Sequence, residues 1–394
     1  MGSSRQRLRA SGIESPCTNP PHPFCEALDF ARAIAVGSDA GSNGAIEIMQ
    51  VTQTGKSSAA RDSWQPARTR GPSRREAEVA PSPRRAWTGI TERGSLRALS
   101  LIQWIYGHLG RPVVMVLLTP IVGYFFVTGA AARRASRDYL RTLWATARGR
   151  ESLGRRPTRR HIFRHLYEFA ENIVDSMIVW SGDGERIRID EEGSEHLLQL
   201  VRQGRGGILL SAHLGSSDML RVLSQRTGIV LNVLSFTRHA ARINAFFDQL
   251  QPAQRMRLIH FEPGSISVAL EIKAAIERGE FVGILGDRVW ESERGRSVPL
   301  QFLGRRTRFP LGPFLLQATL GCPMLLSTCV RTGHARYAAS TESFATAVVV
   351  PRSERVKYAE ELARRYAAAL ERQCLRTPYQ WFNFFEFWRD EVEP

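Results

Sequence analysis

The stretch "LLSAHLGSSD", residues 209–218, marks the place where an apolar strand ends and a helix is expected to begin. Its apolar part is short and continuous, which is typical of a buried strand in a parallel sheet. His213 and Asp218 follow that strand, with Gly215 between them. Ligands of parallel α/β sheets bind beyond the carboxyl ends of the strands. These three residues are therefore candidates for a functional site.

Strands and helices alternate on both sides of this stretch, from about residue 185 onward. The patterns predict strands at 187–192, 206–211, 229–236, 256–262, 280–287, 323–331 and 334–342. They predict helices at 195–204, 215–228, 239–251, 265–279, 312–321 and 352–374, after further helices within 135–180. Such alternation predicts an α/β fold with a largely parallel sheet flanked by helices.

The histidine and the carboxylate can meet across a corner between loop and helix. The carboxylate of Asp218 would then hold one nitrogen of His213 while the other faces a substrate, as a general base requires. Gly215 allows close approach of a ligand, and nearby backbone N–H groups could bind an oxyanion. The alternative, a purely structural histidine, stays open on this spacing alone. No G-x-S-x-G motif surrounds the neighbouring serines, which argues against a serine hydrolase.

A second polar cluster lies within residues 284–313. Asp287 and Arg288 directly follow the apolar core, residues 281–286, of the strand predicted at 280–287, and Arg305 and Arg306 follow later in the same cluster. Arginines at strand ends can bind phosphate or carboxylate groups through paired hydrogen bonds. The cluster is thus a candidate substrate site, and the alternative is a solvated basic loop.

The formal net charge is +16, and arginine supplies nearly all of the positive charge. This balance favours anionic partners such as phosphate headgroups or an acidic carrier protein. A basic membrane- or nucleic-acid-binding protein without catalysis is the alternative function. No basic run interleaved with aromatic residues supports nucleic acid as a partner. The five cysteines show no paired metal spacing, although Cys17 and Cys25 flank His22, and a reducing compartment is the simpler expectation.

Residues 112–132 carry no charge and are flanked by arginines on both sides. A helix of this length can cross a hydrocarbon core of about 30 Å. Pro120, Gly123 and Gly129 interrupt the segment. A kinked anchor in one leaflet is favoured over a single span or a buried helix, because both flanks are positive.

The composition divides the chain into three parts. Residues 1–86 are rich in Ser, Pro, Gly and Arg. They are expected either to be disordered or to result from a translation start that was assigned too far upstream. Residues 87–134 are expected to form an amphipathic helix followed by the hydrophobic anchor. Residues 135–394 are expected to form the catalytic domain.

Several motifs together resemble a known family. The H-x4-D block of 213–218 resembles that of the lysophospholipid acyltransferase superfamily. The blocks "GDR…VPLQFLGRRTRFPLGP" (286–313) and "PYQWFNFFEFW" (378–388) resemble the branch of lauroyl and myristoyl acyltransferases of lipid A biosynthesis. The stretches "WTGITERGS" (87–95) and "ASRDYL" (135–140) resemble predicted acyltransferases of aryl-polyene gene clusters.

The resemblance implies an enzyme of the cytoplasmic membrane that faces the cytoplasm. It implies transfer of a fatty or related polyketide acyl chain from acyl carrier protein or coenzyme A to a hydroxyl of a lipid or glycolipid, with no cofactor and no metal. His213 is then the base and Asp218 its partner, and Asp287, Arg288, Arg305 and Gly215 line the substrate site. The family usually has Glu where this chain has Asp218, so the resemblance does not specify lipid A itself as the acceptor.

Overall fold

The structure, a computed structural model, describes residues 96–180, 184–236, 256–261, 266–289 and 295–388. The predictions for residues 1–86, for Cys17 and Cys25 and for a helix at 239–251 lie outside these ranges.

Seven strands form one sheet in the order β1-β9-β8-β2-β5-β3-β4. Every neighbouring pair is parallel except β8 and β9, which are antiparallel. The predicted α/β fold with a largely parallel sheet is therefore confirmed, and the strand of the 209–218 stretch lies at its centre. The strands are β1 Arg188–Glu192, β2 Gly207–Ser211, β3 Leu231–Phe236, β4 Met256–Phe261, β5 Phe281–Leu285, β8 Met324–Gly333 and β9 Arg336–Ala345.

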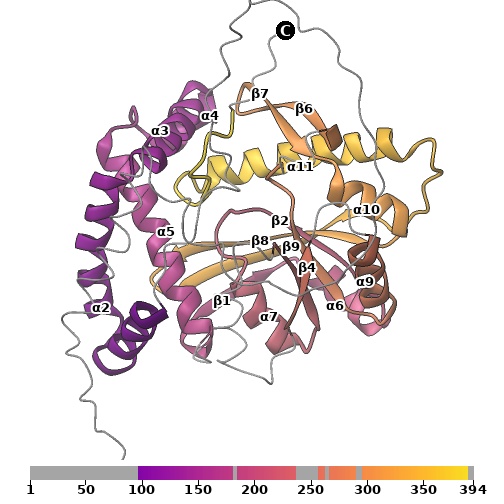
Figure 1. The fold of residues 1–394 in the computed structure, drawn as a ribbon, viewed down its shortest axis with the longest axis horizontal. Coiled ribbons are helices and arrows are strands. Elements are labelled where there is room, and N and C mark those ends of the chain that lie inside the picture. The colour runs from indigo at the N-terminus through magenta and orange to yellow at the C-terminus, as the bar shows by residue number, and fades with distance from the viewer. Residues whose placement is uncertain (1–95, 181–183, 237–255, 262–265, 290–294, 389–394) are drawn as a thin grey trace, which may run out of the picture.

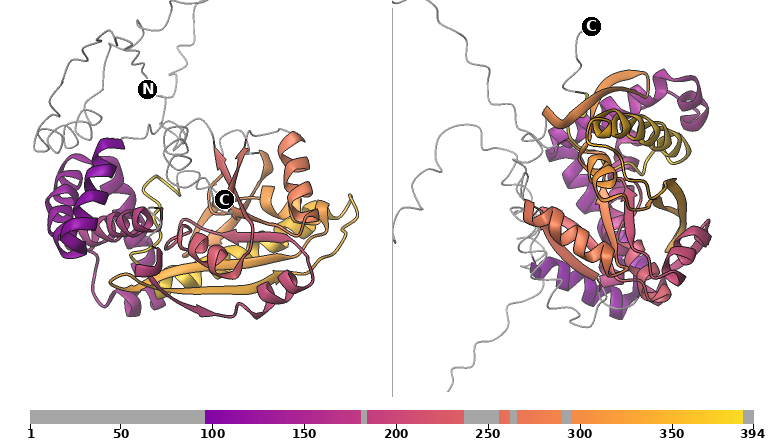
Figure 2. Two further views of the ribbon diagram at one scale, coloured as in Figure 1. Left: turned by 90° about the horizontal axis from the view of Figure 1, so that it is seen from below. Right: turned by 90° about the vertical axis from the view of Figure 1, so that its right-hand side faces the viewer.

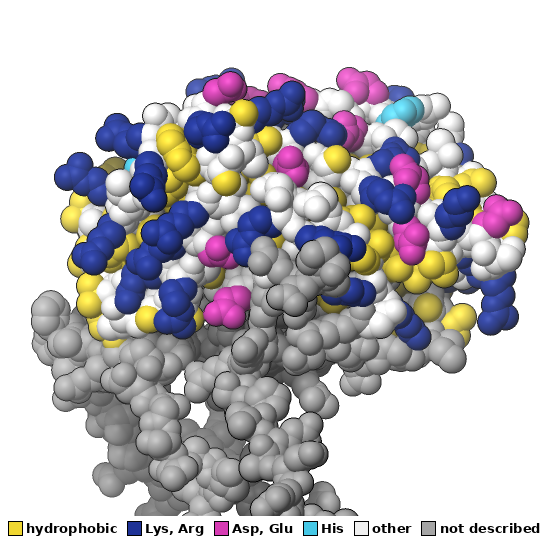
Figure 3. All heavy atoms as spheres, turned by 90° about the horizontal axis from the view of Figure 1, so that it is seen from above, with side chains coloured by type: hydrophobic (Ala, Val, Ile, Leu, Met, Phe, Trp, Pro, Cys, Tyr) yellow, Lys and Arg dark blue, Asp and Glu magenta, His cyan; other side chains and the backbone are white. Residues whose placement is uncertain are grey.

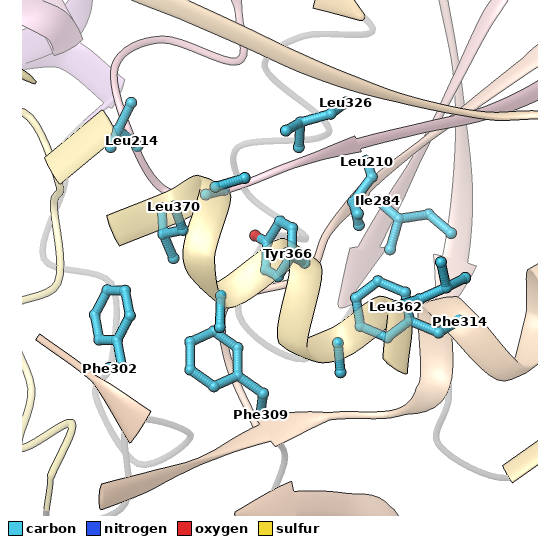
Figure 4. Packing of buried hydrophobic residues seen from close by; sticks show 14 of the residues in the cluster. Leu210, Leu214, Ile284, Phe302, Phe309, Phe314, Leu326, Leu362, Tyr366 and Leu370 are labelled. Atoms are coloured by element: carbon cyan, nitrogen blue, oxygen red, sulfur yellow. The ribbon is translucent and has the colours of Figure 1, made fainter. Parts of the chain in front are cut away.

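Helices cover both faces of this sheet. Helices α9 (Ile266–Glu277), α10 (Gly312–Leu320) and α11 (Arg355–Arg376) lie on one face, and α6 (Glu195–Arg202) and α7 (Met219–Thr227) on the other. The side chains of β2 alternate accordingly, with Leu210 facing α11 and Leu209 facing α6 and α7. Figure 4 shows Leu210 and its strand neighbours facing Tyr366 of α11. Fully buried strands explain why this part of the sequence is continuously apolar.

Four helices form a separate layer beside the β1 edge (Figures 1 and 2). They are α2 (Leu96–Thr128), α3 (Ala130–Ala145), α4 (Ala147–Leu153) and α5 (Arg159–Trp180). Helix α2 bends at Gly110, which has a φ of 78°, and Gly129 separates it from α3. The expected interruptions at Pro120 and Gly123 are wrong, because both lie within the helix. Pro112 has no N–H to donate to the preceding turn, and Gly110, two residues before it, is free to adopt positive φ.

An antiparallel hairpin, β6 (Ser297–Phe302) with β7 (Arg305–Pro310), was not expected from the sequence. It lies on the outer side of α11 (Figure 1). Its turn places Leu303 and Gly304 at positive φ. Phe302 and Phe309 of the hairpin are fully buried and join the core that contains α11. Its arginines and prolines resemble a loop in the sequence, whereas its inward side is aromatic.

Candidate active site

The register of two neighbouring strands brings His213 and Asp287 together. Ser211 at the end of β2 is paired with Leu285 at the end of β5. Each candidate residue lies two positions beyond its strand, so both leave the sheet at the same edge. His213 Nδ1 lies 2.7 Å from Asp287 Oδ1, and the His213 backbone N–H donates to Asp287 Oδ2 at 3.0 Å.

Burial and nearby charge decide the ionisation of this pair. Burial raises the pKa of Asp287, but the His213 ring with its hydrogen bond, together with Arg288, outweighs it, and the pKa is about 2. Burial and then the Arg288 charge lower the pKa of His213, against the opposing effect of Asp287. At neutral pH the histidine is therefore uncharged beside an ionised carboxylate. A carboxylate only accepts, so Nδ1 carries the hydrogen and Nε2 keeps its lone pair.

The carboxylate bonded to Nδ1 belongs to Asp287 and not to Asp218, which corrects the pairing expected from the sequence. Helix α7 begins at Met219, later than expected, and Asp218 is the residue that precedes it. Between His213 and this helix, Leu214 and Gly215 form isolated bridges with the distant residues Trp381 and Cys329.

Gly215 has a structural role here instead of admitting a ligand. A Cβ atom at this position would lie 2.0 Å from the carbonyl oxygen of Cys329. Gly215 also has a φ of 67°, a conformation that side chains disfavour. Its N–H donates to Gln380 O at 2.8 Å, and the Ser216 N–H donates to Cys329 O at 2.7 Å. These two N–H groups are thus already used and are not available to an oxyanion.

The two arginine candidates lie in different surroundings. Arg288 lies beside the pair, donates to the Phe382 carbonyl at 3.3 Å and has its guanidinium 5.3 Å from the ring centroid of Phe385. Arg305 donates to Asp138 Oδ1 at 2.8 Å and to Thr142 Oγ1 at 2.9 Å, both on α3. The structure therefore brings His213, Asp287 and Arg288 together, and joins Arg305 to α3.

The segment 378–388 surrounds the pair with residues that the sequence analysis did not assign. Trp381 is fully buried, and its Nε1–H donates to Asp287 Oδ2 at 3.0 Å. The Phe382 N–H donates to His213 O at 2.7 Å. The signal in the sequence was the density of aromatic residues in this segment, but nothing in it indicated contact with Asp287, 94 residues away.

Comparison with known proteins identifies the family. The family model described as bacterial lipid A biosynthesis acyltransferase matches residues 158–390, which include β2, β5, His213, Asp287 and segment 378–388. None of the curated proteins compared with the chain matches it. Since the match covers more than half of the 394 residues, the chain is an acyltransferase that belongs to the bacterial lipid A biosynthesis acyltransferase family.

Proposed function

We propose that this acyltransferase moves an acyl chain from a thioester donor to a hydroxyl of a lipid or glycolipid, with His213 as the general base. The observation that supports this most is the pairing of a neutral imidazole with a buried carboxylate at the carboxyl end of the central strand. The His213 side chain keeps 27% of its surface exposed, whereas Asp287 keeps 1%. A substrate can therefore reach the imidazole but not the carboxylate.

The reaction follows from the tautomer of His213. Nε2 removes the proton of the acceptor hydroxyl as its oxygen attacks the thioester carbonyl. The tetrahedral intermediate then collapses, the carbon–sulfur bond breaks, and the imidazolium returns the proton to the departing thiolate. The products are an ester and a free thiol. Asp287 stabilises the imidazolium between the two proton transfers.

Arg288 supplies the positive charge for the oxyanion in this proposal. Arg288 follows Asp287 directly in the chain, and its charge lowers the pKa of His213. Preorganised donors of this kind stabilise the transition state strongly in a site shielded from water. Asp218 is assigned to the substrate side of the site, because the Nδ1 side of His213 belongs to Asp287. Arg305 is bonded to Asp138 and Thr142 of α3, so it is assigned to the substrate site only through these two neighbours.

The basic surface supports substrates that carry phosphate, such as acyl carrier protein or coenzyme A donors and phosphorylated lipid acceptors. Figure 3 shows basic side chains spread over the face that carries α3, α4 and α11. A cavity of about 720 Å³ opens where α4 leads into α5. Its lining combines four arginines with two rings, namely Arg155, Arg159, Arg160, Arg164, His161 and Tyr379. Guanidinium groups suit phosphate oxygens.

Membrane association is supported by α2. Within the described residues, Trp104–Thr128 is long and apolar enough to cross a membrane by length and composition. One side of it packs on α5 through Val114, Leu118 and Val122. The other side leaves Val116 71% and Val127 73% exposed.

We place α2 in one leaflet, because a straight span would separate it from α5. Arg111 of α2 is bonded to Glu171 and Asp175 of α5, both at 3.3 Å. Thioester donors are cytosolic, which places the His213 site on the cytoplasmic side of the inner membrane. Arginines at the start of α3 then suit the anionic inner leaflet.

Replacing His213 tests the proposed function. His213→Ala should lower acyl transfer by about 10²–10⁴-fold, because the general base is lost. Transfer is measured with purified protein, acyl carrier protein or coenzyme A thioesters and phosphorylated lipid acceptors. His196→Ala, at an exposed histidine of α6, is the matched control and should keep full activity. Turnover by His213→Ala at the wild-type rate would overturn the assignment, and an inactive wild type that binds anionic vesicles would favour the non-catalytic alternative.

A further inference from the structure

Asp287 is held from a second direction by an indole. Its Oδ2 accepts from the Trp381 Nε1–H and from the His213 backbone N–H, both at 3.0 Å. Its Oδ1 faces His213 Nδ1. The two donors on Oδ2 leave Oδ1 directed at the imidazole, so Trp381 supplies one of the two hydrogen bonds that set the rotation of the carboxylate.

Trp381 is itself held on its far side by a buried histidine. The Trp381 carbonyl lies 2.9 Å from His165 Nε2, and Ser136 Oγ lies 2.9 Å from His165 Nδ1. Because a carbonyl only accepts, Nε2 carries the hydrogen and Nδ1 accepts from the serine hydroxyl. Hydrogen bonds thus connect Ser136 of α3 and His165 of α5 to the backbone of Trp381, and its indole to Asp287 and His213.

The indole has no room to turn away from this position. Its ring contacts Tyr139, Phe302 and Phe387 edge to face, with centroid distances of 4.9 to 5.3 Å. The backbone beside it is bonded to the loop of His213 on both sides, through Gln380 O and the Phe382 N–H. Leu214 and Trp381 also form an antiparallel bridge. The direction of the indole N–H is therefore set by the fold.

We propose that Trp381 is a positioning residue for acyl transfer, which orients Asp287 and so maintains the Nδ1–H tautomer of His213. This inference rests on the proposed role of His213 as general base. His165 and Ser136 are the outer members of the same set of hydrogen bonds and act on Asp287 only through Trp381.

Trp381→Phe tests the proposal, since it keeps an aromatic ring and removes the N–H. Removing a hydrogen bond to a charged group should lower kcat by about 10- to 100-fold. KM should stay unchanged, because Trp381 does not touch substrate. The carboxylate that loses a donor attracts the His213 proton more strongly, so the acid limb of kcat/KM should move to higher pH. The matched control is Trp388→Phe, because Trp388 Nε1 has no hydrogen-bond partner among the described residues.

The outcomes separate this proposal from the proposed function. Loss of activity in His213→Ala, with Trp381→Phe matching the wild type in kcat and pH profile, would overturn the positioning role alone. An equal loss in Trp381→Phe and Trp388→Phe would also overturn it, since packing alone would explain both. If the wild type shows no transfer, the His213 ring titration can be followed by NMR in protein labelled with ¹⁵N-histidine. A titration unchanged by Trp381→Phe would then refute the contact.

Discussion

At the scale of the residue, the carboxylate that is hydrogen-bonded to His213 follows the neighbouring strand of the sheet, β5, and does not come from the helix that follows His213 in the chain. Asp287 lies 74 residues from His213, yet the paired ends of β2 and β5 place them in contact. The same edge brings Arg288 close enough to lower the pKa of the imidazole. An imidazole that is neutral at pH 7 results from this combination of burial and positive charge.

Asp287→Asn should impair catalysis by reversing the tautomer of His213. Oδ2 receives two N–H donors, so the amide oxygen of Asn is expected there and its NH₂ group then faces Nδ1. The ring is then protonated on Nε2 and cannot accept the hydroxyl proton. We expect a loss on the order of 10²–10⁴-fold in kcat, measured against Asp190→Asn, an exposed carboxylate of β1.

The same approach separates the two candidate carboxylates. In Asp218→Asn, Asp287 still accepts the Nδ1 hydrogen, so ¹⁵N NMR should show the His213 ring in its wild-type tautomer. A changed tautomer in Asp218→Asn together with an unchanged one in Asp287→Asn would reverse our assignment.

The pH profile should report the lowered pKa of His213. Activity requires the neutral ring, so kcat/KM should be constant near pH 7 and fall as the pH decreases through a value below 6.5. The measurement is kcat/KM of the free enzyme between pH 4.5 and pH 8, with acyl thioester and acceptor below saturation. An acid limb above 6.5 in the wild type would contradict the buried, Arg288-facing environment of the base.

At the scale of the element, α5 and segment 378–388 form the wall behind the site, and His165 joins them. His165 is fully buried and its pKa falls to about 4, chiefly through desolvation. Both ring nitrogens are hydrogen-bonded in the neutral form, so the uncharged ring can be buried with no unpaired polar atom. Protonation would remove the acceptor that the Ser136 hydroxyl uses. This element contact should therefore weaken in acid.

The stability of the protein should depend on pH through His165. The unfolded chain binds this proton near pH 6.5 and the folded chain only near pH 4, so the contribution is complete above 6.5 and is lost as the pH falls toward 4. The difference is on the order of 3 kcal/mol. Urea unfolding at pH 7 and pH 5 should show a smaller pH effect in His165→Gln than in the wild type. His196→Gln is the control, and equal pH effects in all three proteins would refute the assignment.

At the scale of the whole molecule, the catalytic sheet and the apolar helix belong to one folded body. The α2 side chains that face α5 share a buried cluster with Tyr337 and Ala339 of β9. Helix α2 is therefore joined to the sheet by packing as well as by the chain. Arg331 of β8 adds ion pairs to Glu168 and Glu171 of α5. In the proposed one-leaflet arrangement, α2 would therefore also orient the His213 edge relative to the membrane.

Polar substitutions on the outer side of α2 should release the protein from membranes without unfolding it. Val116→Gln combined with Val127→Gln removes two strongly exposed apolar side chains that make no core contact. The intact protein should resist a high-salt wash of the membrane fraction, and the double variant should appear in the wash. Val349→Gln, at a position 78% exposed elsewhere on the surface, is the matched control. Intact protein in the soluble fraction at low salt would refute the anchor.

The sequence by itself determined the alternation of strands and helices, and hence the parallel sheet and the edge where the site lies. Burial on both faces produces continuous apolar strands, and this local pattern can be read without the fold. It also pointed to His213, Asp287 and Arg288, because each follows a strand end. The sequence did not predict the hairpin β6–β7, because its aromatic side chains are buried only through contacts with α11 and segment 378–388.

Only the tertiary structure decided which of these residues lie together. The order of β2 next to β5 is a property of the sheet, so the sequence spacing favoured Asp218 although the register selects Asp287. Gly215 likewise seemed suited to a ligand until the approach of Cys329 showed what requires its missing side chain. Trp381 could not be assigned at all, because hydrogen bonds between segments far apart in the chain depend on packing that no local pattern encodes.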